Sequence, residues 1–140
     1  MTTELPSGLL ETVDPAEDLA RFLTQSSHYS GGVARPSAFL PSPKDRATSV
    51  SRHGSEPIET LRQLGLAAAG DRSLHGAAII KCGAVRDADL SVDADEPPAR
   101  HALIRGWPWL ENDRQLEKAQ QKEKALQLVA ATSEVVLFRA

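Results

Sequence analysis

Aromatic residues are scarce in this chain, at 4% of its 140 residues. A hydrophobic core must therefore be built mainly from alanine, leucine and valine, whose side chains bury less area than an aromatic ring. The few large apolar rings should matter disproportionately to packing. They are Phe22, Phe39, Phe138, Trp107 and Trp109.

Cysteine occurs once, as Cys82, so the chain cannot form an internal disulfide. A single thiol suits a reducing compartment and predicts a cytoplasmic location. No apolar run approaches the ~18 residues of a membrane span, and residues 1–13 lack the basic start and apolar middle of a signal peptide. We therefore expect a soluble protein without a membrane partner.

The chain also lacks an excess of charge of one sign, because 16 basic and 19 acidic residues give a net charge of −3. Such a balance excludes attraction of the whole surface to nucleic acid or to an anionic membrane, but it does not exclude local basic patches. No catalytic triad, phosphate loop or quartet of metal ligands is recognisable. The sequence therefore predicts no cofactor and no metal site.

A chain of this length fits one domain with a real core. Residues 1–13 show no hydrophobic period, so we expect them to form an N-terminal extension to a single domain at 14–140. Capping signals and apolar spacing then predict helices. Asp14, Pro15 and Glu17 make a strong helix start, and Asn112 and Gln115 make another. The predicted helices cover residues 14–26, 56–69 and 112–132.

Extended segments lie between these helices. Pro36 removes a backbone donor from the first of them, which predicts an edge strand or a break there. The run at 76–81 is almost wholly apolar, as expected of a strand that is buried on both faces. Without strict alternation of strands and helices, the pattern favours an α+β fold with a mostly antiparallel sheet. The predicted strands cover residues 33–40, 47–52, 76–81, 99–106 and 134–139.

Polar side chains concentrate on three of these predicted strands. Arginine offers a fork of donors for phosphate or carboxylate, serine adds neutral donors, and histidine exchanges protons near neutral pH. If 33–40 pairs with 47–52 and 99–106 lies beside them, these side chains form an anion pocket with His101 as an acid/base group. The alternative is a solvated sheet face with His101 in the core. The candidates are Arg35, Ser37, Lys44, Ser49, Arg52, His53 and His101.

Two blocks of the sequence resemble a family of small, uncharacterised bacterial proteins. The first is Gly-x-Val…Ala-Phe-x-Pro…Ser-Val within residues 31–52, and the second is His-Ala-x-Ile at 101–104. The resemblance implies that 31–52 and 98–108 belong together, and it carries no activity. Family members often place an arginine directly before the valine, whereas Arg35 here follows Val33. The resemblance also suggests a mobile-element or defence context.

A second candidate surface follows the 99–106 segment. Trp107 and Trp109 flank a proline and are either packing anchors or an exposed hot spot, and at least one should be used in the core. Arg114, Lys118 and Lys122 are spaced to stack along one helix face, where they could contact an acidic or phosphorylated partner. The alternative for these three is an ordinary solvated face.

Two further features are assigned structural roles. Cys82 could pair with His75 as nucleophile and base, but its apolar neighbours favour a buried thiol in the core. The acidic run at 87–96 offers oxygen ligands for calcium, but it lacks a tight-turn glycine. We interpret this run as a solvated edge that blocks strand pairing.

Two functions remain open. The first is a non-catalytic binding or accessory module that holds a protein or nucleic-acid partner through a basic sheet face. The second is a small enzyme for a phosphorylated or nucleotide substrate, with Arg35 and Lys44 on the anion and His101 as acid/base. The absence of a second convincing catalytic group favours binding, and the sequence alone leaves the oligomeric state open.

Overall fold

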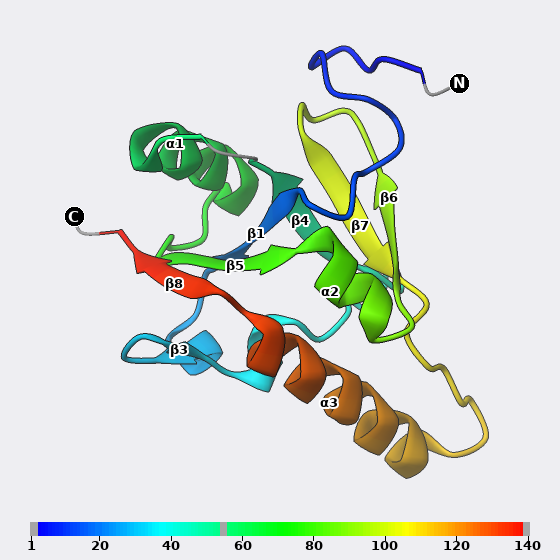
Figure 1. Ribbon diagram of the computed structural model, residues 1–140. Coiled ribbons are helices and arrows are strands. Elements are labelled where there is room, and N and C mark those ends of the chain that lie inside the picture. Colours follow the sequence, from blue (N-terminus) through cyan, green and yellow to red (C-terminus); the bar gives the residue numbers. More distant parts are fainter. Residues whose placement is uncertain (1–2, 54–55, 139–140) are drawn as a thin grey trace.

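The computed structural model describes residues 3–53 and 56–138, and this part of the chain contains eight strands and three α-helices (Figure 1). The strands are β1 (Asp18–Leu23), β2 (Tyr29–Ser30), β3 (Val33–Ala34), β4 (Thr48–Arg52), β5 (Gly76–Lys81), β6 (Ser91–Ala94), β7 (His101–Arg105) and β8 (Glu134–Leu137). The helices are α1 (Ile58–Ala69), α2 (Cys82–Asp87) and α3 (Arg114–Ala131).

Six of the strands form one antiparallel sheet in the order β6-β7-β4-β1-β5-β8, and β2 and β3 form a separate two-stranded hairpin. The predicted α+β class is therefore confirmed. No helix in the described part of the chain is long and apolar enough to cross a membrane.

The helix predicted for residues 14–26 is wrong, because β1 occupies the centre of the sheet there. The capping contacts do form: Asp14 N donates to Glu17 Oε2 and Ala16 N donates to Asp14 Oδ1, each at 2.8 Å. They close a single turn, after which the chain enters the sheet. Tertiary burial decides the outcome, since β1 buries Leu19 and Leu23 on one face and Ala20 and Phe22 on the other.

The strand predicted for residues 33–40 is also wrong over most of its length. Only Val33 and Ala34 of this range form a strand, and they pair with β2, not with β4. Pro36 then begins a 3-10 helix that ends at Ala38. Because a proline has no N–H to donate to a ladder, it ends the strand at the position where the sequence predicts a break.

Helix α1 and strands β4, β5, β7 and β8 agree closely with the predicted ranges, whereas strand β2, helix α2 and strand β6 lie outside them. Strand β6 forms the acidic edge of the sheet. Helix α3 begins at Arg114, two residues after the start of the predicted range, and Asp113 rather than Asn112 caps it by accepting from Leu116 N at 3.0 Å. Residue 139 of the predicted closing strand lies outside the described residues.

Helices cover the two sides of the sheet unequally (Figure 1). Helices α2 and α3 pack on one side over the larger core, which includes Phe39, Ile80 and Trp107. Helix α1 packs on the other side, where Leu61 meets Phe22 and a smaller core. This helix contacts β1 and β5, so the β4–β7 half of that side is left more open.

The strand register places polar residues on this open half. Ser51 of β4 lies opposite Ala20 of β1 and opposite His101 of β7, while Ser49 lies opposite Leu103. Because Ala20 belongs to the core under α1, all these directly opposed residues face the α1 side. Ser49 and His101, two residues of the predicted polar cluster, therefore lie on one face of the sheet.

The N-terminal residues described pack against the domain. Val13 is buried in the larger core, and the Leu10 carbonyl accepts a hydrogen bond from Arg52 Nη1 at 2.7 Å. An isolated bridge joins Glu4 and Leu10. Residues 3–13 therefore close one edge of the core next to β4.

Candidate functional site

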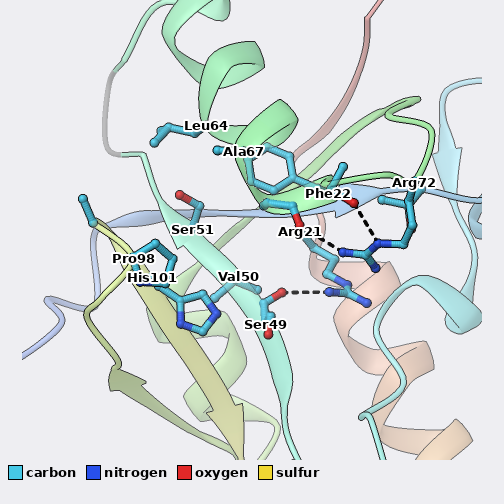
Figure 2. A pocket seen from close by; sticks show the side chains of 14 residues that line it. Arg21, Phe22, Ser49, Val50, Ser51, Leu64, Ala67, Arg72, Pro98 and His101 are labelled. Carbon is cyan, nitrogen blue, oxygen red and sulfur yellow. Dashed lines mark hydrogen bonds between the residues drawn. The ribbon is translucent and has the colours of Figure 1, made fainter.

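A cleft of about 280 Å³ lies between the second half of α1 and the open half of the sheet (Figure 2). Its apolar wall is formed by Phe22, by Leu64 and Ala67 of α1, and by Pro98. Its polar side chains are Arg21, Thr24, Ser49, Ser51, Arg72 and His101.

Arg21 stands where β1 and β4 separate. These strands pair only at Leu19 and Ala20, whereas β1 pairs with β5 along its whole length. Beyond the paired part, Arg21 Nη1 donates to the Ser49 carbonyl at 2.9 Å and Arg21 Nε donates to the Ala38 carbonyl at 2.6 Å. The side chain thereby holds the separated segments together and lines the cleft.

Arg72 reaches the cleft from the turn that follows α1. Its Nε donates to the Ala69 carbonyl at 3.1 Å and its Nη2 donates to the Ala68 carbonyl at 3.0 Å. These acceptors belong to the end of α1, where helix carbonyls lack partners within the helix. Figure 2 shows the Arg72 and Arg21 guanidinium groups next to each other, on the side of Ser49 away from His101.

The surroundings of this arginine pair are electropositive. Burial and the nearby Arg72 charge lower the pKa of Arg21 to about 10, so Arg21 stays protonated at neutral pH. Burial and the charges of Arg21, His75 and Arg72 lower the pKa of His28. Within the described residues, neither Arg21 nor Arg72 forms an ion pair with a carboxylate. The cleft therefore holds two adjacent cations without a counter-charge.

His101 lies at the opposite end of the cleft and is oriented by the chain that precedes β7. Its Nδ1 lies 3.0 Å from both the carbonyl oxygen and Oδ2 of Asp95. With Nδ1 donating to these oxygens, Nε2 is the ring nitrogen left for a ligand. Ser51 stands directly across the strand pair, although no hydrogen bond joins the two side chains within the described residues.

The structure brings together two of the residues predicted to bind an anion and separates the others. Ser49 and His101 line the cleft. Arg35 and Lys44 are exposed and line no part of it, and Ser37 donates to the Ser27 carbonyl at 2.7 Å. The separation follows from the absence of pairing between residues 33–40 and β4.

Arg52 is a structural residue, although it was predicted to bind an anion. It is 1% exposed, and its Nε and Nη2 donate to the two carboxylate oxygens of Glu17 at 2.9 and 2.8 Å. This paired carboxylate and the Leu10 carbonyl satisfy the guanidinium on the side of the sheet away from the cleft. His53, also in the predicted cluster, is buried, and neither ring nitrogen has a partner among the described residues.

The proposed partner surface is divided in the structure. Trp107 lies in the larger core, where its Nε1 donates to the Ile104 carbonyl at 3.2 Å, so the expected core use of one tryptophan is confirmed. Trp109 is half-buried, and the Arg46 guanidinium carbon lies 5.0 Å from the centre of the Trp109 ring. Lys118 and Lys122 are exposed, and Arg114 pairs with Glu117 at 3.4 Å.

Cys82 is completely buried in the larger core, as the sequence predicts. Burial raises the pKa of its thiol, and its sulfur lies 3.9 Å from the Val13 carbonyl oxygen. His75 instead lies beside Tyr29, whose hydroxyl is 2.8 Å from His75 Nδ1. The thiol and this histidine therefore have separate surroundings.

Arg21 and Arg72 are the site residues that the sequence reasoning missed. Arg21 was placed on a helix, where a charged residue beside an apolar face is unremarkable. In a strand buried on both faces, the same arginine becomes an anomaly that points to a site. Arg72 follows the helix-ending Gly70 in a turn, and no sequence signal distinguishes it from an ordinary surface arginine.

Comparisons with protein-family models, with curated proteins and with solved structures found no match to this chain. The resemblance suggested by the two sequence blocks therefore stays a prediction.

Proposed function

We propose that this protein is a non-catalytic binding module that holds its partner through an anionic group in the cleft. One observation carries the proposal: Arg21 and Arg72 lie side by side in a concave site without an acidic partner among the described residues. Arginine pairs of this kind suit phosphate and carboxylate groups, which accept charge-assisted hydrogen bonds.

The physical reason is the repulsion between the two cations. Without a ligand, burial lowers the pKa of Arg21 and the nearby charge of Arg72 lowers it further, so both disfavour the charged form of Arg21. An anion between the guanidinium groups replaces this repulsion with attraction and accepts hydrogen bonds from N–H groups that have no acceptor among the described residues. The partly enclosed cleft strengthens both effects relative to bulk water.

A small enzyme for a phosphorylated or nucleotide substrate is the second candidate. The observation in its favour is the 3.0 Å contact between Asp95 Oδ2 and His101 Nδ1, which orients His101 as an acid/base group in the cleft. Arg35 and Lys44 do not line the cleft, so Arg21 and Arg72 take their role of anion binding in this alternative. If the wild type hydrolyses p-nitrophenyl phosphate and His101→Ala does not, the protein is an enzyme rather than a binding module.

Thermal unfolding with added anion tests the binding proposal. Inorganic phosphate at ~10 mM and low ionic strength should raise the Tm of the wild type, because a ligand bound only by the folded state stabilises it. Arg72→Ala should remove most of the rise. Added NaCl should also weaken it, because exposed charges are screened.

Arg35→Ala is the matched control, since it removes an exposed arginine that lies outside the cleft. The Tm rise should survive in this variant. In ¹⁵N spectra of the wild type, the Nε–H signals of Arg21 and Arg72 should shift during the titration. Absence of a Tm rise with both phosphate and sulfate at low salt, together with unmoved Nε–H signals, would exclude the proposal.

The biological setting stays a prediction. A cytoplasmic location is proposed from the single buried thiol, and a bacterial mobile-element or defence context is proposed from the sequence resemblance. The contact proposed here is between an anionic group of the partner and the two arginines of the cleft. A protein or a nucleic acid can present such a group.

A further inference from the structure

We infer that the cleft takes a small phosphate monoester whose body is apolar or aromatic, with the phosphate on Arg21 and Arg72 and the body against Phe22 and Leu64. This inference rests on the proposed function, because it names the chemical class of ligand for the same cleft.

The arginine pair offers more donors than a carboxylate can use. A guanidinium has five N–H groups. Each of these two uses two on backbone carbonyls, which leaves three on each without an acceptor among the described residues. A phosphate monoester carries a charge of about −1.5 to −2 and three strong acceptor oxygens. A carboxylate supplies a single charge and two oxygens, so phosphate is the better match to two cations.

The cleft continues past the arginines along an apolar wall. Phe22 is 7% exposed and firmly packed, Leu64 is half-buried, and Ala67 and Pro98 extend the surface. A free inorganic ion at the arginines leaves this wall in contact with water, whereas an organic body covers it. The volume of about 280 Å³ is close to the lower end of small-ligand sites.

Charges at the far end favour a small ligand over a nucleic-acid strand. Beyond His101, the edge strand β6 and the residues after it present Asp93 and Asp95, whose side chains are about half exposed. Asp93 Oδ2 lies 3.6 Å from Arg105 Nη1 and Asp95 Oδ2 lies 3.0 Å from His101 Nδ1, so these carboxylates already have partners within the protein. A strand that continued from the arginines past His101 would bring further phosphates towards these carboxylates. A ligand with one phosphate ends before them, where Ser51 and His101 can hydrogen-bond a polar group on its body.

Calorimetric titration of the full chain with three probes tests the inference. Phenyl phosphate should bind about tenfold more tightly than inorganic phosphate, because its ring covers the apolar wall. It should also bind about tenfold more tightly than benzoate, because its charge matches both arginines. Arg72→Ala should weaken both phosphate probes.

Leu64→Ala should remove the advantage of phenyl phosphate over inorganic phosphate while it leaves the affinity for inorganic phosphate unchanged. Leu66→Ala is the matched control, because Leu66 lies on the same helix but outside this cleft. The ratio of two affinities within one variant does not depend on its stability. If Leu64→Ala fails to fold, Ala67→Gln, at an exposed position on the same wall, serves instead.

The outcomes separate the inference from the proposed function. Equal binding of benzoate and phenyl phosphate overturns the inference and leaves an anion-binding cleft. Tighter binding of a 5′-phosphorylated oligothymidylate than of phenyl phosphate overturns the small ligand in favour of nucleic acid. Failure of all probes to bind at millimolar concentration and low salt overturns both.

Discussion

Arg52 and Arg21 occupy neighbouring central strands, β4 and β1, yet their surroundings are opposite. Arg52 is buried against both oxygens of the Glu17 carboxylate, so its charge is compensated where it lies. Arg21 bonds to two neutral carbonyls and lies beside another cation, Arg72. The Arg52 charge is compensated by the Glu17 carboxylate, whereas Arg21 has no carboxylate partner among the described residues.

The comparison teaches that burial of an arginine does not by itself mark a site. A buried charge is costly unless it is paired and hydrogen-bonded, so a compensated arginine such as Arg52 belongs to the structure. An arginine that borders a cleft with its charge uncompensated keeps the capacity to bind an anion from outside. Substitutions around Arg52 and around Arg21 should therefore differ in their effects on stability.

Removal of the Arg52 counter-charge should have the largest effect. Glu17→Ala should lower the free energy of unfolding by about 3–5 kcal/mol, because it leaves a buried guanidinium without its carboxylate. Denaturant unfolding measures the loss. Glu59→Ala is the control, since its exposed pair with Arg62, at 3.8 Å, should contribute less than about 1 kcal/mol. Equal losses in the two variants would contradict the assignment of Arg52 as a compensated structural charge.

The same pair should respond to acid. Burial alone would raise the pKa of Glu17, but hydrogen bonds from Arg52 and the Asp14 backbone, with the charge of Arg52, lower it below 4.5. A lowered folded-state pKa stabilises the fold above the ordinary pKa, and the contribution is lost as pH falls through the folded value. The difference between wild type and Glu17→Ala should therefore shrink below pH ~4, as denaturant midpoints measured across that range can show.

Cys82 reports on the closed region around Arg52. Cys82→Ala should cost about 1–2 kcal/mol, as expected for loss of a small, fully buried side chain. The native thiol should react slowly with a modifying reagent and quickly in denaturant, and Glu17→Ala should speed the native reaction. Rapid labelling of native wild type would mean that this region is open.

His53 follows Arg52 at the end of β4 and should make the fold sensitive to mild acid. Burial lowers its pKa below 6.5, so the unfolded chain takes up the proton first and stability falls as pH drops below that value. His53→Leu should change stability at pH 7.5 by less than about 1 kcal/mol, because neither ring nitrogen has a partner within the described residues. His53→Leu should also lose less free energy of unfolding between pH 7.5 and 5.5 than the wild type does. If the variant loses as much as the wild type, His53 is not the source of the acid sensitivity. Some loss should remain, since the pKa of His28 is also lowered.

Arg72→Ala should have the smallest effect on the unliganded protein. The exposed side chain gives up two bonds to the end of α1 but also relieves repulsion with Arg21. These changes oppose each other, so the free energy of unfolding should move by less than about 0.5 kcal/mol. A loss as large as that of Glu17→Ala would make Arg72 structural and would remove the contrast with Arg52.

The elements that could be predicted from sequence are those whose patterns agree with their tertiary setting. The apolar run of β5, the alternation in β7 and the spacing in α1 each fit one structure. Residues 19, 20, 22 and 23 fit both a helix face and a strand buried on two sides. A capping box favours the helix, and only pairing with β4 and β5 resolves the choice.

The candidate site follows the same division. Ser49 and His101 could be predicted to share a face because strand alternation fixes which side each occupies. Arg35 was predicted to join this cluster because residues 33–40 were expected to pair with β4. That pairing does not form, since Pro36 begins a 3-10 helix. Arg21 and Arg72 meet through contacts between distant segments, and the error over β1 removed the one local signal for Arg21. Long-range geometry, rather than local propensity, creates this arginine pair.

The two carbonyl bonds of Arg21 have a consequence for what can replace it. The rigid, planar fork reaches Ala38 and Ser49 through different nitrogens while the rest of the group remains available to the cleft. A lysine at this position would retain the charge, but its single ammonium cannot reproduce the fork geometry. Exchange of one basic residue for another is therefore not a conservative change here, and tolerance of lysine at position 21 would mean that charge alone is sufficient.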